Sequence, residues 1–241
     1  MTYRSPRQRA VTPQARGRFG DFDVLSSVGQ WDDVTAGVVL GRLALPGELA
    51  FFTPGEVAIA APLLDLLLAQ DGEPRIPVLA LIDQRLAVGE TDGWHYDDLP
   101  EDAQAWRATL SALDDDARSG PTGRPFAELP SPAQAVLVQS VHDLANTVHP
   151  DPGQPGRWHE WPAQQVWSLW TRYACTAFYS HPWAWNEIGF PGPAYPRGYL
   201  HAGVGDRERW ERADRVDRDP TTFAQRVEAA RREHDRLRGG G

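Results

Sequence analysis

Apolar positions recur at helical spacing in this chain from Thr53 onward. Several of these stretches begin with a proline beside a residue that caps helices. Proline is favoured in the first helical turn because its missing amide donor would have no partner there. The pattern predicts six helices, at residues 53–69, 77–87, 100–118, 131–147, 161–180 and 219–237. No convincing sheet is visible, so the six helices predict an all-α fold. We expect an irregular helical bundle with extended terminal arms and with long loops that are rich in proline, glycine and aromatic residues.

The fifth predicted helix, residues 161–180, has the widest apolar surface. Val166, Leu169 and Tyr173 lie on one stripe, and Trp167 and Phe178 extend the apolar surface around the helix. A helix with apolar residues on more than one side is covered on more than one side. We therefore expect this helix at the centre of the bundle.

The beginning of the chain lacks a clear period. Residues 23–27 and 38–45 fit short strands or extended pieces, and we interpret residues 20–52 as an arm that wraps the bundle. The first 18 residues hold five arginines and no acidic residue, which is typical of a solvated tail. The predicted organisation is a flexible basic arm at 1–20, a helical domain at 21–205 and a charged helical extension at 206–241.

The segment from Phe178 to Tyr199, FYSHPWAWNEIGFPGPAYPRGY, is the most unusual part of the sequence. It holds three tyrosines, two tryptophans and two phenylalanines, and its four prolines and three glycines exclude a single regular element. Ordering such a path costs conformational entropy, so we expect many aromatic contacts, either with the chain's own helices or with a partner. The candidate partner-binding residues are Tyr179, His181, Trp183, Trp185, Asn186, Phe190, Tyr195, Arg197 and Tyr199.

The same segment resembles the signature region of the gluconate 2-dehydrogenase subunit 3 family. The shared features are a Phe-Tyr-x-x-Pro step at 178–182, a Gly-Phe-Pro-Gly turn at 189–192 and a Tyr-Pro-x-Gly-Tyr tail at 195–199. The resemblance implies a small non-catalytic subunit that binds a large FAD-dependent dehydrogenase of the glucose-methanol-choline (GMC) type, which acts on a sugar or polyol. It implies that FAD belongs to that partner and that this chain holds no cofactor. The single cysteine and the lack of a Cys-x-x-Cys-His motif exclude covalent c-type haem and cysteine-ligated clusters, so any electron path lies in other subunits. The resemblance supplies no catalytic residue.

Charge and hydropathy narrow the remaining classes of function. The formal net charge is −9, and residues 19–205 hold 9 arginines against 24 acidic residues, a balance of −15. An acidic body disfavours nucleic acid as the main partner, because phosphate binding needs a basic face. No apolar run approaches the length of a membrane helix, and no secretion signal is visible near the first residues. We expect a cytoplasmic protein, or one that crosses a membrane with a partner that bears the signal.

A different class of function stays open, that of a free-standing metal-dependent enzyme. His142 and His149 are seven residues apart, near one face of the fourth predicted helix, and Asp143 lies beside them. The spacing lacks the known His-Glu-x-x-His and Glu-x-x-His patterns, so hydrogen-bonded histidines are the favoured interpretation. Cys175 is expected to be a buried, inert thiol. His181 is expected to cap the fifth helix as a protonated imidazole, and a contact with the partner is its alternative role.

Overall fold

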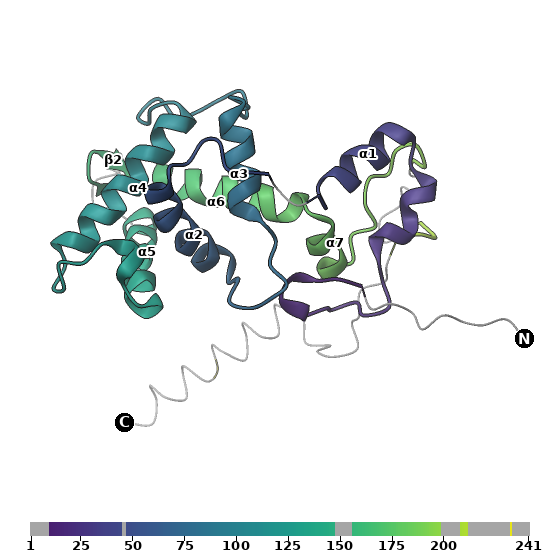
Figure 1. Cartoon of the computed structure of the whole chain (residues 1–241), viewed down its shortest axis with the longest axis horizontal. Helices are drawn as coiled ribbons and strands as arrows, with labels where there is room; N and C mark the ends of the chain where they lie inside the picture. Colours follow the sequence, from purple (N-terminus) through teal and green to yellow (C-terminus); the bar gives the residue numbers. More distant parts are fainter. Residues whose placement is uncertain (1–9, 45–46, 148–155, 199–207, 212–231, 233–241) are drawn as a thin grey trace, which may run out of the picture.

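Helix α6 (Ala163–Ser180) runs through the centre of the molecule, as its apolar pattern predicted (Figure 1). The computed structural model describes residues 10–44, 47–147, 156–198, 208–211 and 232. Around α6 pack α2 (Pro54–Leu68), α3 (Val78–Ala87), α4 (Asp102–Ser119) and α5 (Ser131–Asn146). These five helices form the larger of two lobes. The all-α prediction is confirmed, and five of the six predicted helices lie within about two residues of their expected bounds.

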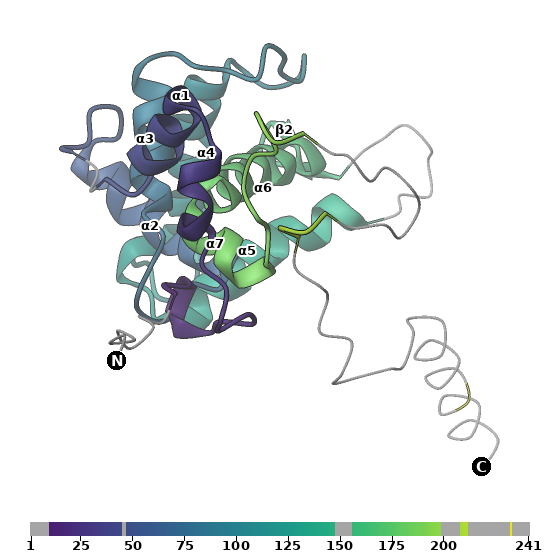
Figure 2. The same cartoon turned by 90° about the vertical axis from the view of Figure 1, so that its right-hand side faces the viewer.

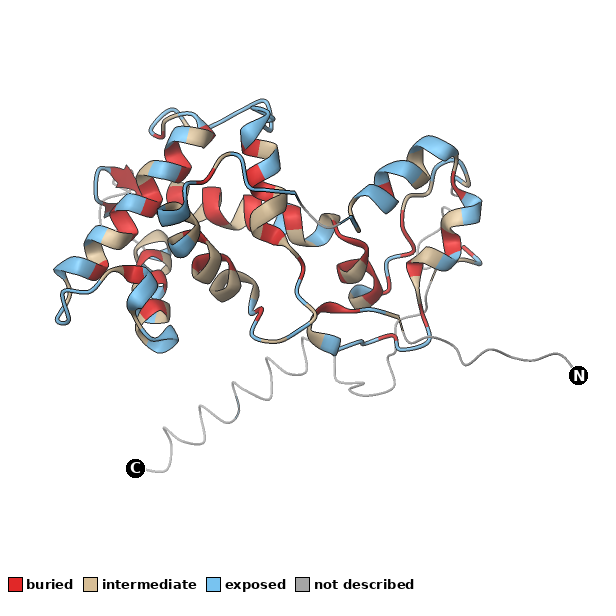
Figure 3. Ribbon diagram, in the orientation of Figure 1, coloured by how far each residue is buried: buried red, intermediate tan, exposed pale blue. Residues whose placement is uncertain are grey.

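The core of the larger lobe is dense in aromatic side chains. Trp106 of α4 and Trp170 and Tyr173 of α6 are almost completely buried, and the Trp170 indole donates a hydrogen bond of 3.0 Å to the buried Thr109 hydroxyl. The Trp106 ring meets Tyr173 edge to face with 5.8 Å between centroids. Figure 3 shows the buried residues gathered on the inner faces of these helices. Burial of rings this large is the main stabilising contribution to the lobe.

The start of α2 shows how local sequence sets an element. Thr53 caps the helix by accepting from the Glu56 amide, and the Glu56 carboxylate accepts from the Thr53 amide in return. This reciprocal arrangement satisfies amides that have no partner within the helix. Arg107 of α4 adds an ion pair of 2.6 Å to Glu56, which joins the first turn of α2 to its neighbour.

The smaller lobe corrects the expectation for the beginning of the chain. Residues predicted as strands or extended pieces form the 3-10 turn η2 (Val24–Gln30) and helix α1 (Asp33–Gly41). The 3-10 turn η1 (Pro13–Ala15) falls within the predicted basic arm. Asp23 and Asp32 cap η2 and α1 by accepting from main-chain amides, a local signal that outweighs the β preference of the valines. The short helix α7 (Pro182–Ile188) completes this lobe. Figure 2, which faces the lobe, shows the N-terminal segment against α7.

Part of the predicted basic arm is packed. Thr12 and Phe19 are buried, and the main-chain amide of Gln14 donates to the Pro74 carbonyl at 2.7 Å. Residues 1–9 lie outside the described part of the chain, so the predicted boundary at residue 20 stays a prediction.

Two smaller features complete the fold. A hairpin of β1 (Arg157–Trp158) and β2 (Trp161–Pro162) precedes α6 and is anchored by the buried rings of Trp158 and Trp161; η3 (Phe126–Glu128) lies between α4 and α5. In the described ranges no helix is both long and apolar enough to cross a bilayer. The predicted helix at 219–237 falls outside the described residues, apart from position 232.

Candidate partner-binding surface

The segment from Phe178 to Tyr199, which we call the signature segment, begins in the last turn of α6. His181 stands between α6 and α7 with extended backbone angles, φ −89° and ψ 134°. The ring of Pro182 excludes the helical conformation for the residue before it, so α6 stops there and Pro182 becomes the first residue of α7. The prediction of an irregular segment was therefore too simple, because seven of its residues form a helix.

His181 caps both helices: its main-chain amide donates to the Phe178 carbonyl at 3.2 Å at the end of α6, and its side chain caps α7. Its Nδ1 atom accepts from the Trp183 amide at 3.2 Å, and only 2% of the residue is exposed. Burial, together with the positive charge of Arg42, lowers the pKa of His181 from 6.5 to about 4. The imidazole is therefore neutral at neutral pH, which corrects the expected protonated state; the expected cap at the end of α6 is made by the main chain.

Asn186 joins the signature segment to the N-terminal residues. Its Oδ1 accepts from the Val24 amide and its Nδ2 donates to the Val11 carbonyl, each at 2.8 Å. Val24 is fully buried and Asn186 is 2% exposed, so no solvent replaces the first of these bonds. The side chain thus fixes η2 against α7 across 162 positions of sequence.

Trp185 fills the core of the smaller lobe. It packs with Phe19, Val24 and Trp31, and its Nε1 donates to the Tyr179 carbonyl at 2.6 Å. The Arg42 guanidinium lies 5.9 Å from its ring centroid. Trp185 is 5% exposed, so this side chain stabilises the lobe in the described structure.

The turn after α7 requires its glycines. Gly189 and Gly192 have φ of +72° and +80°, the left-handed region that residues with a Cβ atom disfavour. A Cβ at Gly192 would lie 2.5 Å from the Trp31 ring, and one at Gly189 would lie 2.8 Å from the Phe19 ring. The Trp31 Nε1 donates to the Pro193 carbonyl at 3.0 Å, which closes the turn over the N-terminal segment.

Arg197 contributes to the same closure. Its guanidinium donates to the carbonyls of Pro191 and Pro193 at 3.1 and 2.8 Å, and to the Gln30 side chain at 2.9 Å. These bonds hold the end of the segment to the turn and to η2. An arginine that was predicted as a partner contact therefore has extensive contacts within its own chain.

The remaining predicted contacts differ in exposure. Tyr179, Phe190 and Tyr195 are exposed by 51%, 38% and 65%, and Ile188, which the sequence reasoning missed, by 48%. Trp183 is half-buried, and its ring meets the His181 imidazole edge to face. Tyr199 lies outside the described residues. We refer to the exposed side chains of Tyr179, Ile188, Phe190 and Tyr195 together as the aromatic surface. A contact between these side chains and a partner stays a prediction.

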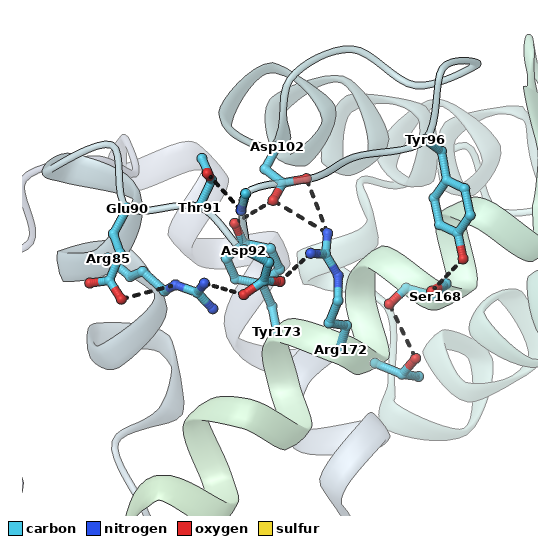
Figure 4. Close-up of polar contacts among 11 residues, drawn as sticks. Arg85, Glu90, Thr91, Asp92, Tyr96, Asp102, Ser168, Arg172 and Tyr173 are labelled. Carbon is cyan, nitrogen blue, oxygen red and sulfur yellow. Dashed lines mark hydrogen bonds and ion pairs between the residues drawn. The ribbon is translucent and has the colours of Figure 1, made fainter.

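A polar network joins α6 to α3 and α4 (Figure 4). The Tyr173 hydroxyl donates to the buried Asp102 carboxylate at 2.7 Å, and Arg172 donates to the same carboxylate at 3.1 Å. Arg172 and Arg85 both pair with Asp92. Burial and the neighbouring carboxylate raise the pKa of Tyr173, so the phenol keeps its proton. Local sequence patterns could not reveal this network, because its members come from three separate stretches of the chain.

The metal site considered as an alternative has only part of its ligands in the described residues. His142 Nδ1 lies 3.2 Å from the Asp143 carboxylate and 3.0 Å from the Gln139 amide, and its ring packs on Trp167. His149 lies outside the described ranges. Within those ranges, no group of three or more histidine, cysteine, aspartate or glutamate residues is arranged to hold a metal ion. Cys175 is exposed, which corrects the expected buried thiol.

The fold and the surface define a helical protein whose most distinctive segment carries packing residues and exposed aromatic rings. Residues 54–192 match the family model described as gluconate 2-dehydrogenase subunit 3. The match covers α2 to the Gly-Phe-Pro-Gly turn, more than half of the chain, and the chain belongs to this family. Searches of curated proteins and of solved structures returned no match. The family is that of a subunit of a dehydrogenase complex, so the resemblance seen in the sequence is confirmed.

Proposed function

We propose that this chain is a non-catalytic accessory subunit that binds and stabilises a large FAD-dependent dehydrogenase of the GMC type, which oxidises a sugar or polyol. FAD and the oxidation chemistry belong to the partner in this proposal, and further electron transfer belongs to the partner or to another subunit. Membership of the subunit 3 family carries the proposal. The cytoplasmic location stays the prediction made from the sequence.

The aromatic surface supports the choice of contact region. Phe190, whose ring also packs edge to face on Trp185, and Tyr195 lie in a turn that Asn186, Trp31 and Arg197 tie to the rest of the lobe. Aromatic side chains on a rigid backbone lose little conformational freedom on binding, so they contribute strongly to affinity. Each of the two rings is expected to contribute on the order of 2 kcal/mol to complex formation.

Co-expression tests this proposal. The tagged chain is produced together with the GMC-type flavoprotein encoded in the same genome, and the purified complex is quantified by flavin absorbance. Phe190→Ala and Tyr195→Ala should each weaken the complex about 30-fold, the equivalent of about 2 kcal/mol. Val136→Ala, an exposed position on α5, serves as the matched control and should leave affinity unchanged.

Trp185 is unsuitable for this test because its substitution would disturb the core of the smaller lobe. Absence of flavoprotein from the purified parent chain would refute the proposed function. Recovery that is equal in all three variants would instead remove the aromatic surface from the interface.

A further inference from the structure

A groove separates the two lobes beside α3. It consists of two adjoining cavities of about 450 and about 350 Å³, and both are lined by Arg42, Leu81, Gln84 and Val88. We call these four residues and the space they border the interlobe groove. Gln84 is on α3, and Val88 follows the last residue of that helix and is 72% exposed. Arg42 approaches from the end of α1, so both lobes contribute to the lining.

Most of the charges along the groove are neutralised within the chain. Arg85 pairs with Asp92 and Glu90, and Asp92 also pairs with Arg172. The Asp83 carboxylate accepts from the amides of Ala50, Phe51 and Phe52 at 2.7 to 3.0 Å. These bonds fix the walls of the groove, and the charges of Arg85, Asp92 and Asp83 are already paired or hydrogen-bonded within the chain.

Arg42 differs from these groups. Its guanidinium donates to the Ser180 carbonyl at 3.1 Å, and no carboxylate of the described residues, the cavity-lining Glu48 included, forms an ion pair with it. Burial lowers the pKa of Arg42, and its uncompensated charge helps to lower the pKa of His181. A half-buried cation is stabilised when an opposite charge comes to it from outside.

The exposed face of α1 leads into the same groove. Val34, Val38 and Gly41 are spaced to share one side of the helix, and the first two are 75% and 54% exposed. Gly41 itself lines the second cavity. A helix that is apolar on all sides is usually covered on all sides, yet much of α1 faces solvent in Figure 3. A segment that covers this groove would therefore need apolar side chains for the exposed face of α1 and a negative charge for Arg42.

We propose that the interlobe groove receives a segment of the large dehydrogenase subunit in which a carboxylate flanked by apolar side chains pairs with Arg42. The inference rests on the proposed function, because family membership supplies the partner, and it adds the place of contact and the chemistry of the bound segment. The carboxylate neutralises Arg42, and the flanking side chains cover Val34, Val38 and Val88. This contact is separate from the aromatic surface.

Crosslinking from the groove provides the first test and leaves Arg42 intact. A benzophenone amino acid replaces Val88 in the co-expressed complex, and another chain carries it at Val136, which is 69% exposed on α5 and lines neither cavity. We expect crosslinks from position 88 to a flavoprotein peptide that contains aspartate, glutamate or the terminal carboxylate, and few from position 136. Crosslinks from 88 to a second copy of this chain, to its own C-terminal residues, or to no peptide would overturn the assignment.

Charge substitution provides the second test. Arg42→Glu should weaken the complex at least about 30-fold, since it places two like charges in a partly buried contact, whereas Arg42→Lys should retain most of the affinity. Arg118→Glu makes the same charge change on α4, outside the groove, and should have little effect. Equal affinity for Arg42→Glu and Arg118→Glu would refute the groove contact while leaving the proposed function intact. Failure of the parent chain to bind the flavoprotein would refute both.

Discussion

Asn186→Ala is the substitution that most directly tests how the smaller lobe is held together. It removes the acceptor of the Val24 amide and the donor to the Val11 carbonyl, two bonds of 2.8 Å. A buried amide left without an acceptor costs about 1 to 3 kcal/mol, and Val24 is fully buried. Val11 is 43% exposed, so water can replace its lost donor at a cost of at most about 1 kcal/mol. We expect a total loss of about 2 to 3 kcal/mol.

The loss should be confined to the smaller lobe, so the assay must be local. Native-state hydrogen exchange measured by mass spectrometry reports the opening free energy of individual peptides. Peptides from residues 19–31 should exchange about 30 to 140 times faster in the variant, the equivalent of about 2 to 3 kcal/mol. Peptides from the middle of α4, around the buried Trp106, should keep the exchange rates of the parent chain.

Asn146→Ala is the matched control, because Asn146 also donates from Nδ2 to a main-chain carbonyl but does so on an exposed face of α5. It should change exchange by no more than about twofold in either lobe. A folded Asn186→Ala protein whose residues 19–31 exchange less than about threefold faster would refute the reasoning that this side chain holds the N-terminal segment to α7.

Two further predictions concern the same lobe. Gly192→Ala forces a Cβ atom to within 2.5 Å of the Trp31 ring at a φ of +80°, so it should lower the opening free energy of residues 19–31 by about 2 to 4 kcal/mol. Gly198→Ala, at a φ of +70° with open space around it, should lower the same free energy by about 1 kcal/mol. Equal effects of the two substitutions would contradict the role of Trp31. For His181, the folded pKa of about 4 lies below the unfolded 6.5, so the unfolded state binds more protons and the lobe should lose roughly 3 kcal/mol of stability as pH falls from 6.5 to 4. His181→Asn retains a capping oxygen without a titratable ring, and a pH dependence of lobe protection as steep as that of the parent chain would exclude the imidazole as its source.

The sequence predicted the larger lobe well because its helices are encoded locally. Proline starts, the Thr53 to Glu56 capping box and the stripe on α6 are short-range signals, and the structure confirms each of them. The smaller lobe was predicted poorly, because the valines of α1 favour extended structure by composition and only the Asp32 cap indicates a helix. Local pattern could not show that this helix packs near a segment about 150 positions later in the chain.

The candidate surface was predicted in part for the same reason. The density of aromatic residues located the right segment, but composition could not separate Trp185, which fills a core, from Tyr195, which faces solvent. That difference depends on Phe19 and Trp31, whose rings pack with Trp185 in the core of the smaller lobe. The sequence also could not show that Arg42 forms no ion pair with a described carboxylate, because local patterns do not indicate which acidic side chain an arginine meets in the fold.

The bond between Val24 and Asn186 has a consequence for biosynthesis. The two residues are 162 positions apart, so at ordinary translation rates the ribosome needs roughly 8 to 30 seconds to make the second after the first. Throughout that interval the nascent chain presents Phe19 and Trp31 without the α7 side chains that cover them. The first tens of residues are therefore a natural client for chaperones that act at the ribosome, and the smaller lobe closes only after almost all of the larger one has emerged.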